Sequence, residues 1–168
     1  GYEIKEAVIS HLKDKGYPIE DAGCHSTESV DYPDYANLVA GAVATGAKDL
    51  GILCCTTGIG MSVAANRHLY VQAAVVTDPN LAAKTRVHND TNVLCLAGEI
   101  TNNDEVTAIV DAWLEASFDD GGRHRRRVDK MNACSISVTA PHLATTDPAV
   151  STVIQEEEQR QSENIELI

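Results

Sequence analysis

The sequence predicts an α/β fold in which helices flank a mainly parallel sheet. Short continuous apolar runs, typical of strands buried on both faces, alternate along the chain with segments whose apolar residues recur at helical spacing. Strands that alternate with helices indicate parallel pairing through right-handed crossovers. The 168 residues and the hydrophobic fraction of 43% are sufficient for one domain with an ordinary core.

The first third of the chain predicts two helices. Apolar residues at helical spacing indicate a helix over residues about 3 to 15, which Gly16 ends. A short extended stretch over residues 17–21 follows. The turn Asp31-Tyr32-Pro33-Asp34 places a proline near the start of the second helix, which ends near Gly46.

The remainder of the domain alternates regularly between the two element types. Strands are expected over residues 50–54, 71–76 and 92–96, and helices over 61–66, 80–87, from an N-cap at Asp104 through Trp113, and over 123–132. From about Ser135 the composition becomes rich in Thr, Ala and Pro without periodicity, and the end of the chain is charged. We expect a domain over residues 1–134 and a tail over 135–168 that is largely disordered, with an exposed helix as the alternative for its end.

Charge and cysteine content narrow the class of protein. A formal net charge of -12 disfavours a nucleic-acid partner, because phosphate backbones select basic surfaces. No apolar run reaches the roughly 18 residues of a membrane span, and no signal peptide opens the chain. Five cysteines without zinc-ligand spacing predict reduced thiols, no metal and a cytoplasmic location.

Three segments carry candidate site residues. The run from Cys54 to Gly60 lies between a buried strand and a helix, where a glycine-containing loop favours anions and a thiol's pKa is lowered. The polar run from His88 to Asn92 precedes another strand. The run from Gly121 to Arg127 is strongly basic, and arginines pair bidentately with phosphate oxygens. The alternatives are a buried structural thiol, an ordinary surface histidine and a solvated helix face.

The order of these segments resembles the ribose-5-phosphate isomerase B family, also called the RpiB/LacAB family. The resemblance is carried by Asp31-Tyr32-Pro33-Asp34, Cys55-x-Thr57-Gly58-x-Gly60-Met61-Ser62-x-Ala64-Ala65-Asn66, His88-Asn89-Asp90-Thr91-Asn92, and Gly121-Gly122-Arg123-His124-x-x-Arg127. It extends from Gly1 to about Ala133 and excludes the tail.

The resemblance implies a Rossmann-like three-layer sandwich and a metal-free aldose–ketose isomerase that needs no cofactor and works as a homodimer or homotetramer. The expected substrate is a phosphorylated sugar, first of all ribose 5-phosphate, which becomes ribulose 5-phosphate through a cis-enediolate. The implied catalytic residues are Cys55 as base, Thr57 and His88. The implied substrate-binding residues are Tyr32, Thr56, Gly58, Ile59, Gly60, Asn89, Arg123, His124 and Arg127.

Three departures from the family pattern leave a second class open. The family's first strand, which ends in an Asp-His segment, has no counterpart before Gly1, so we expect the sequence to be an N-terminally incomplete form. Thr56 replaces the usual glycine after the catalytic cysteine, and Glu99 replaces an arginine common in the family. The alternative is therefore a non-catalytic sugar-phosphate-binding or assembly protein. A flavodoxin-like signalling domain ranks last, because Cys55 stands where a phospho-accepting carboxylate is needed.

Overall fold

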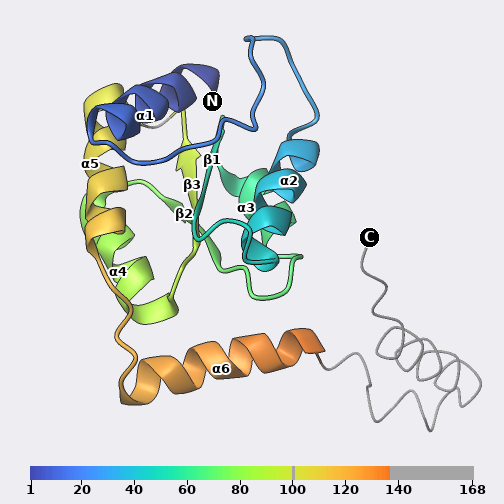
Figure 1. The fold of residues 1–168 in the computed structure, drawn as a ribbon, viewed down its shortest axis with the longest axis vertical. Helices are drawn as coiled ribbons and strands as arrows, with labels where there is room; N and C mark the ends of the chain where they lie inside the picture. Colours follow the sequence, from blue (N-terminus) through green and yellow to red (C-terminus); the bar gives the residue numbers. More distant parts are fainter. Residues whose placement is uncertain (100, 137–168) are drawn as a thin grey trace, which may run out of the picture. The chain divides into compact units, whose positions relative to one another are not determined.

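The computed structural model describes residues 1–99 and 101–136, so most of the predicted tail, from residue 137, lies outside the described residues. Residues Gly1–Asp129 form one compact unit. The helices of the described residues are α1 (Tyr2–Asp14), α2 (Tyr32–Ala44), α3 (Ile59–Ala65), α4 (Pro79–Asn89), α5 (Asn103–Glu115) and α6 (Gly122–Ile136). The strands are β1 (Gly51–Cys55), β2 (Ala73–Val76) and β3 (Val93–Ala97) (Figure 1).

The three strands form a parallel sheet in the order β1-β3-β2. Gly51 pairs with Val93 and Cys55 pairs with Ala97, so β1 and β3 begin and end together. Among the described residues β1 pairs with β3 alone, which makes β1 an edge strand. The mainly parallel α/β sheet expected from the sequence is confirmed.

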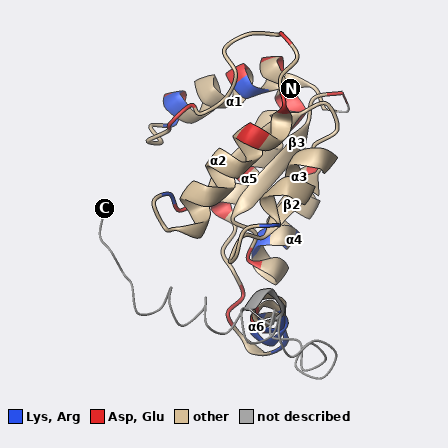
Figure 2. Cartoon of the chain, turned by 90° about the vertical axis from the view of Figure 1, so that its right-hand side faces the viewer, with Lys and Arg blue, Asp and Glu red and all other residues tan. Residues whose placement is uncertain are grey.

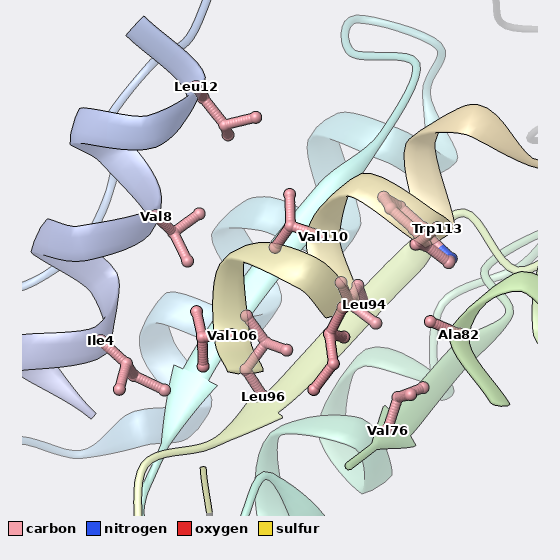
Figure 3. Close-up of a cluster of buried hydrophobic side chains, with 11 residues drawn as sticks. Ile4, Val8, Leu12, Val76, Ala82, Leu94, Leu96, Val106, Val110 and Trp113 are labelled. Atoms are coloured by element: carbon pink, nitrogen blue, oxygen red, sulfur yellow. The ribbon is translucent and has the colours of Figure 1, made fainter. Parts of the chain in front are cut away.

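Two apolar clusters cover the two faces of the sheet. Leu94 and Leu96 of β3 point into a cluster with α1, α4 and α5, whereas Val93 and Cys95 point into a cluster with α2 and α3. Figure 1 shows the same two groups of helices on opposite sides of the strands, and Figure 3 shows the larger cluster. Alternate side chains of β3 face opposite layers of helices, so every residue of this strand must be apolar. The fold is therefore a three-layer sandwich with helices on both faces of the sheet.

Polar contacts fix the helices of the larger cluster. Asp111 of α5 accepts hydrogen bonds from His11 of α1 and from Lys15, the C-cap residue of α1, each at 2.7 Å. Burial opposes ionisation of Asp111, yet the hydrogen bonds from Lys15 and His11 hold its pKa below the usual 3.8. These contacts hold α1 against α5.

Several predicted boundaries differ from the observed ones. The predicted N-cap at Asp104 is wrong, because Asn102 caps α5 and forms a capping box with Glu105. Residues 17–21 form no regular strand. The strand predicted over 71–76 begins only at Ala73, because the N–H of Gln72 donates to the side chain of Asn92 at 2.8 Å. His88 and Asn89, expected between a helix and a strand, belong to the last turn of α4.

Among the described residues, no helix combines the length and the apolar character needed to cross a membrane.

Candidate active site

Cys55 ends β1 at the carboxyl edge of the sheet, where ligands of parallel α/β sheets bind. It packs against the α2–α3 cluster, whereas its neighbour Cys54 packs against the cluster of α1 and α5. Burial raises the pKa of the Cys54 thiol to about 12. Two adjacent thiols therefore lie in different layers, and only Cys55 borders the loop that leads into α3.

The loop after Cys55 depends on two glycines. Gly58 caps α3 with a φ of 73°, in the left-handed region that glycine adopts without strain. A Cβ atom on Gly60 would lie 2.6 Å from the ring of Tyr32, so the tyrosine packs directly on this loop. The Thr57 hydroxyl accepts a hydrogen bond from the N–H of Ile59 at 3.4 Å, which leaves its proton free to donate.

The residues that follow β3 lie beside the same loop. The N–H of Gly98 donates to the carbonyl of Cys55 at 2.8 Å, and the N–H of Glu99 donates to the carbonyl of Thr56 at 3.0 Å. The Thr56 residue is exposed, so it leaves the loop uncrowded. Glu99 is therefore joined to the loop through its backbone, and its side chain is exposed.

A hollow of about 480 Å³ opens next to Gly98, between the start of α1 and the start of α5. Glu3 and Asp104 contribute carboxylates to its lining, and Cys55 does not line it. Two carboxylates do not suit a phosphate, because like charges repel. We therefore assign the candidate site to the Cys55 loop and not to this hollow.

His88 and Asn89 lie at the other edge of the sheet, because α4 ends just before β3 begins. This helix end is firmly braced. The buried Thr91 accepts a hydrogen bond from the indole N–H of Trp113 at 2.9 Å, and Arg86 donates to the Thr91 carbonyl at 2.6 Å. The Asn92 side chain donates to the carbonyl of Tyr70 at 2.7 Å. Thr91 and Asn92 therefore fix the backbone between α4 and β3. His88 lies in the last turn of α4, so these contacts also limit its movement.

The basic segment lies close to His88. The ring of His124 stacks on the ring of His88 with centroids 4.5 Å apart and planes 4° from parallel. Arg123 and Arg127 are exposed, one helical turn apart, and form no ion pair among the described residues, whereas Arg125 pairs with Asp120 and Asp129. Figure 2 shows the basic residues of α6 in blue. The arginines singled out from the sequence are therefore free to bind an anion.

One chain does not bring the two groups of candidate residues together. Cys55 lies at the carboxyl edge, and His88 lies near the amino edge; the five-residue strands between these edges span about 13 Å. Tyr32, Thr56, Thr57, Gly58, Ile59 and Gly60 belong to the first group, and Asn89, Arg123, His124 and Arg127 to the second.

Sequence reasoning missed the residues that support His88. Thr91, Trp113 and Asp119, whose N–H donates to the carbonyl of Val87 at 3.0 Å, fix the end of α4. The single tryptophan of the chain was the available signal, because a buried indole N–H needs an acceptor. Thr91 is 22 residues away in the sequence, so the sequence did not indicate which residue supplies that acceptor.

A parallel sheet with a cysteine-bearing glycine loop at its carboxyl edge and a histidine–arginine group elsewhere is the arrangement expected of a sugar-phosphate isomerase. The family model described as Ribose/Galactose Isomerase matches residues 1–131. Ribose-5-phosphate isomerase B of Escherichia coli is 44% identical over 133 residues, which cover 79% of this chain and 89% of that protein.

Solved structures agree. Ribose-5-phosphate isomerase B of Clostridium thermocellum superposes with a TM-score of 0.79 at 44% identity, over 82% of this chain and 92% of that one. The Mycoplasma genitalium protein, solved with bound ribulose 5-phosphate, has a TM-score of 0.74 at 43% identity and covers 78% of this chain and 87% of that one. The chain belongs to the ribose/galactose isomerase family, as the motifs indicated, and is an isomerase by class.

Proposed function

We propose that this protein interconverts a phosphorylated aldose and its ketose, with ribose 5-phosphate and ribulose 5-phosphate as the first pair to test. The observation that carries the proposal is the position of Cys55, which ends a strand beside a glycine loop in a layer different from that of Cys54. The Mycoplasma genitalium relative with bound ribulose 5-phosphate supports the choice of substrate.

In the proposed reaction the Cys55 thiolate removes the proton from the hydroxyl-bearing carbon next to the carbonyl. The electron pair forms a cis-enediolate, and the proton returns to the former carbonyl carbon while the hydroxyl proton moves between the two oxygens. Atoms and charge therefore balance without a co-reactant. Thr57 donates its free hydroxyl proton to these oxygens, and N–H groups of residues 56–60 stabilise the developing charge.

The remaining residues bind and prepare the sugar. Tyr32 packs over Gly60 and limits the loop side of the site. His88 assists ring opening as acid and base, and Asn89 binds sugar oxygens. Arg123 and Arg127 hold the phosphate, with His124 beside Arg123, and this binding fixes the sugar against the base and lowers the entropic cost of reaction.

The proposed site is completed by a second copy of the chain, in a homodimer or a tetramer built from such dimers. The distance of about 13 Å between the two edges of one sheet supports this arrangement, because one pentose phosphate must reach both groups of residues. An exposed apolar surface on α2 and α3 also supports it: Leu38, Ile59 and Val63 are 61%, 59% and 52% exposed. Side chains of this kind gain by burial against another subunit.

We place the protein in the cytoplasm. The thiols of Cys24, Cys54, Cys55 and Cys95 are free, which suits a reducing compartment.

The activity is tested by following ketose formation from ribose 5-phosphate with the wild-type chain, Cys55→Ala and Cys54→Ala. We expect Cys55→Ala to abolish turnover and Cys54→Ala to retain it. Binding of the sugar phosphate without turnover in the wild-type chain indicates the alternative, a non-catalytic binding protein, which the carboxylate of Glu99 beside the loop would favour. Equal loss in both variants contradicts Cys55 as the base.

The shared site is tested by complementation. Cys55→Ala and His88→Ala should each be inactive alone. When the two are co-expressed, half of the dimers are mixed and each holds one intact site of two, so about a quarter of wild-type activity should return. No recovery in mixed dimers of demonstrated composition rules out a site built from two chains.

A further inference from the structure

We propose that His124 is a positioning residue that holds both His88 and Arg123 in their working orientations; the inference rests on the proposed function. His124 is 7% exposed, although it follows a glycine pair on a basic helix where its neighbours Arg123 and Arg125 reach solvent. A histidine that only added positive charge for a phosphate would gain nothing from burial, because burial disfavours the charged ring.

The first contact of His124 is with His88. The two rings lie 4.5 Å apart and nearly parallel, so the ring of His124 covers one face of the ring of His88. His88 lies on α4 and His124 on α6, and the N–H of Asp119 donates to the carbonyl of Val87, which ties the intervening segment to the end of α4. The stack restricts rotation of the His88 ring and therefore directs its nitrogen atoms.

The second contact is with Arg123. The Nε atom of Arg123 donates to the Nε2 atom of His124 at 3.4 Å, so His124 uses this nitrogen as an acceptor and carries its proton on Nδ1. The carboxylate of Asp119 lies farther from the same nitrogen, at 3.9 Å. Because the bond uses Nε of the guanidinium, the two terminal nitrogens of Arg123 remain available for an anion.

The second ring nitrogen of His124, Nδ1, is inaccessible to solvent and has no hydrogen-bond partner among the described residues. Neither nitrogen is thus presented to a phosphate. His124 contributes to phosphate binding through Arg123 and to proton transfer through His88.

Three substitutions separate the two contacts. His124→Phe keeps a flat ring for the stack but removes the acceptor. His124→Gln offers an amide oxygen to Arg123 but removes the ring. His124→Ala removes both.

In steady-state kinetics with ribose 5-phosphate, we expect His124→Phe to keep most of kcat and to raise KM. We expect His124→Gln to keep KM and to lower kcat about 10- to 100-fold, the cost of a catalytic group displaced by about 1 Å. His124→Ala should show both defects. A direct polar contact with substrate predicts instead that Gln retains kcat and Phe loses it, and a merely structural role predicts equal losses in Phe and Gln; either result overturns the proposal. If His124→Ala does not fold, the comparison of Phe with Gln still decides.

A measurement without substrate separates this inference from the proposed function. The ring protons of His88 in the full chain, followed by NMR, should shift in His124→Ala and His124→Gln, which lack the neighbouring ring, and change little in His124→Phe. If the wild-type chain neither binds nor isomerises ribose 5-phosphate, the proposed function fails, and these shifts still report whether His124 holds His88. Unchanged His88 resonances in His124→Ala contradict the positioning role.

Discussion

At the scale of single residues, the neighbouring cysteines show that position decides chemistry. Cys54 and Cys55 have the same side chain, yet the two-residue period of a strand directs them into opposite layers. The sequence identified Cys55 because a glycine loop follows it directly. The surroundings of each thiol depend on helices that are distant in sequence, so its burial could not be predicted.

Gly58 tests the loop that follows Cys55. Gly58 has a φ of 73°, and an added Cβ would lie 3.3 Å from the Leu96 carbonyl oxygen and 3.3 Å from Val75. Gly46 is the matched control, with a φ of 75° and no atom within 4 Å of an added Cβ. We expect Gly46→Ala to lower the free energy of unfolding by about 1–2 kcal/mol, and Gly58→Ala to lower it further and to reduce activity. Equal unfolding energies with full activity in both variants would contradict a close-packed loop at Gly58.

Glu99 provides an electrostatic test beside the same loop. Its backbone N–H is bonded to the Thr56 carbonyl, so its negative charge is carried on a residue next to the loop, and we expect that charge to oppose the approach of a phosphorylated sugar. Removing a charge at close range in water is worth about 1 kcal/mol, so Glu99→Gln should lower KM up to about fivefold. The decrease should shrink as salt rises from 10 mM to 1 M, because ions screen the charge. Asp14→Asn, which changes the same net charge at the end of α1, should leave KM unaltered; a similar decrease there would indicate a general charge effect.

At the scale of elements, the parts of the fold that follow from local patterns were predictable. Apolar spacing identified α1 and α5, and continuous apolar runs identified β1 and β3. Two boundaries were not predicted. The side chain of Asn92, 20 residues away in sequence, binds the backbone before β2. At α5 the local capping box of Asn102 with Glu105 takes the place that we assigned to Asp104. His88 was expected in a loop because polar residues follow it, but α4 continues to Asn89 and ends at Asp90, which adopts the left-handed conformation.

The contact between α1 and α5 gives a prediction at this scale. The pKa of Asp111 is lowered by Lys15 and His11 despite the opposing effect of burial. A carboxylate with a depressed folded pKa contributes stability above its unfolded value of about 3.8 and loses it as the pH falls through the folded value. Asp111→Asn should therefore lower the free energy of unfolding by about 1 kcal/mol at pH 7 and by much less near pH 3. Urea denaturation at both pH values measures this difference.

Asp14→Asn is the control for Asp111→Asn. Asp14 lies at the end of α1 and forms no ion pair among the described residues. The substitution changes the same net charge without breaking the contact between the helices. A pH-dependent loss as large as that of Asp111→Asn would show that overall charge, and not the link to α1, determines the effect.

At the scale of the whole molecule, the candidate residues were predictable and their arrangement was not. The motifs placed Cys55, His88, Arg123 and Arg127 in one site, whereas a single chain holds them at opposite edges of the sheet. Parallel topology explains the division: a residue that ends a strand and a residue that ends the preceding helix lie at different edges. A sequence motif records that residues occur together along the chain, and it does not record how far apart the fold places them.

The buried thiols make global stability sensitive to alkaline pH. Burial raises the pKa of both the Cys54 thiol and the fully buried Cys95 thiol to about 12. In the unfolded chain these thiols lose their protons near pH 9, while in the folded chain they keep them. The unfolded state then binds fewer protons, so stability must fall as pH rises from about 9 towards 12, by up to about 1.4 kcal/mol per pH unit for each thiol.

Urea denaturation between pH 8 and 10.5 measures this slope of the free energy of unfolding against pH. The double variant Cys54→Ala/Cys95→Ala starts from a lower stability but should show a flatter slope, because its lysines and tyrosines titrate as before. An unchanged slope in the double variant would show that the two thiols ionise as readily in the folded protein as in the unfolded chain.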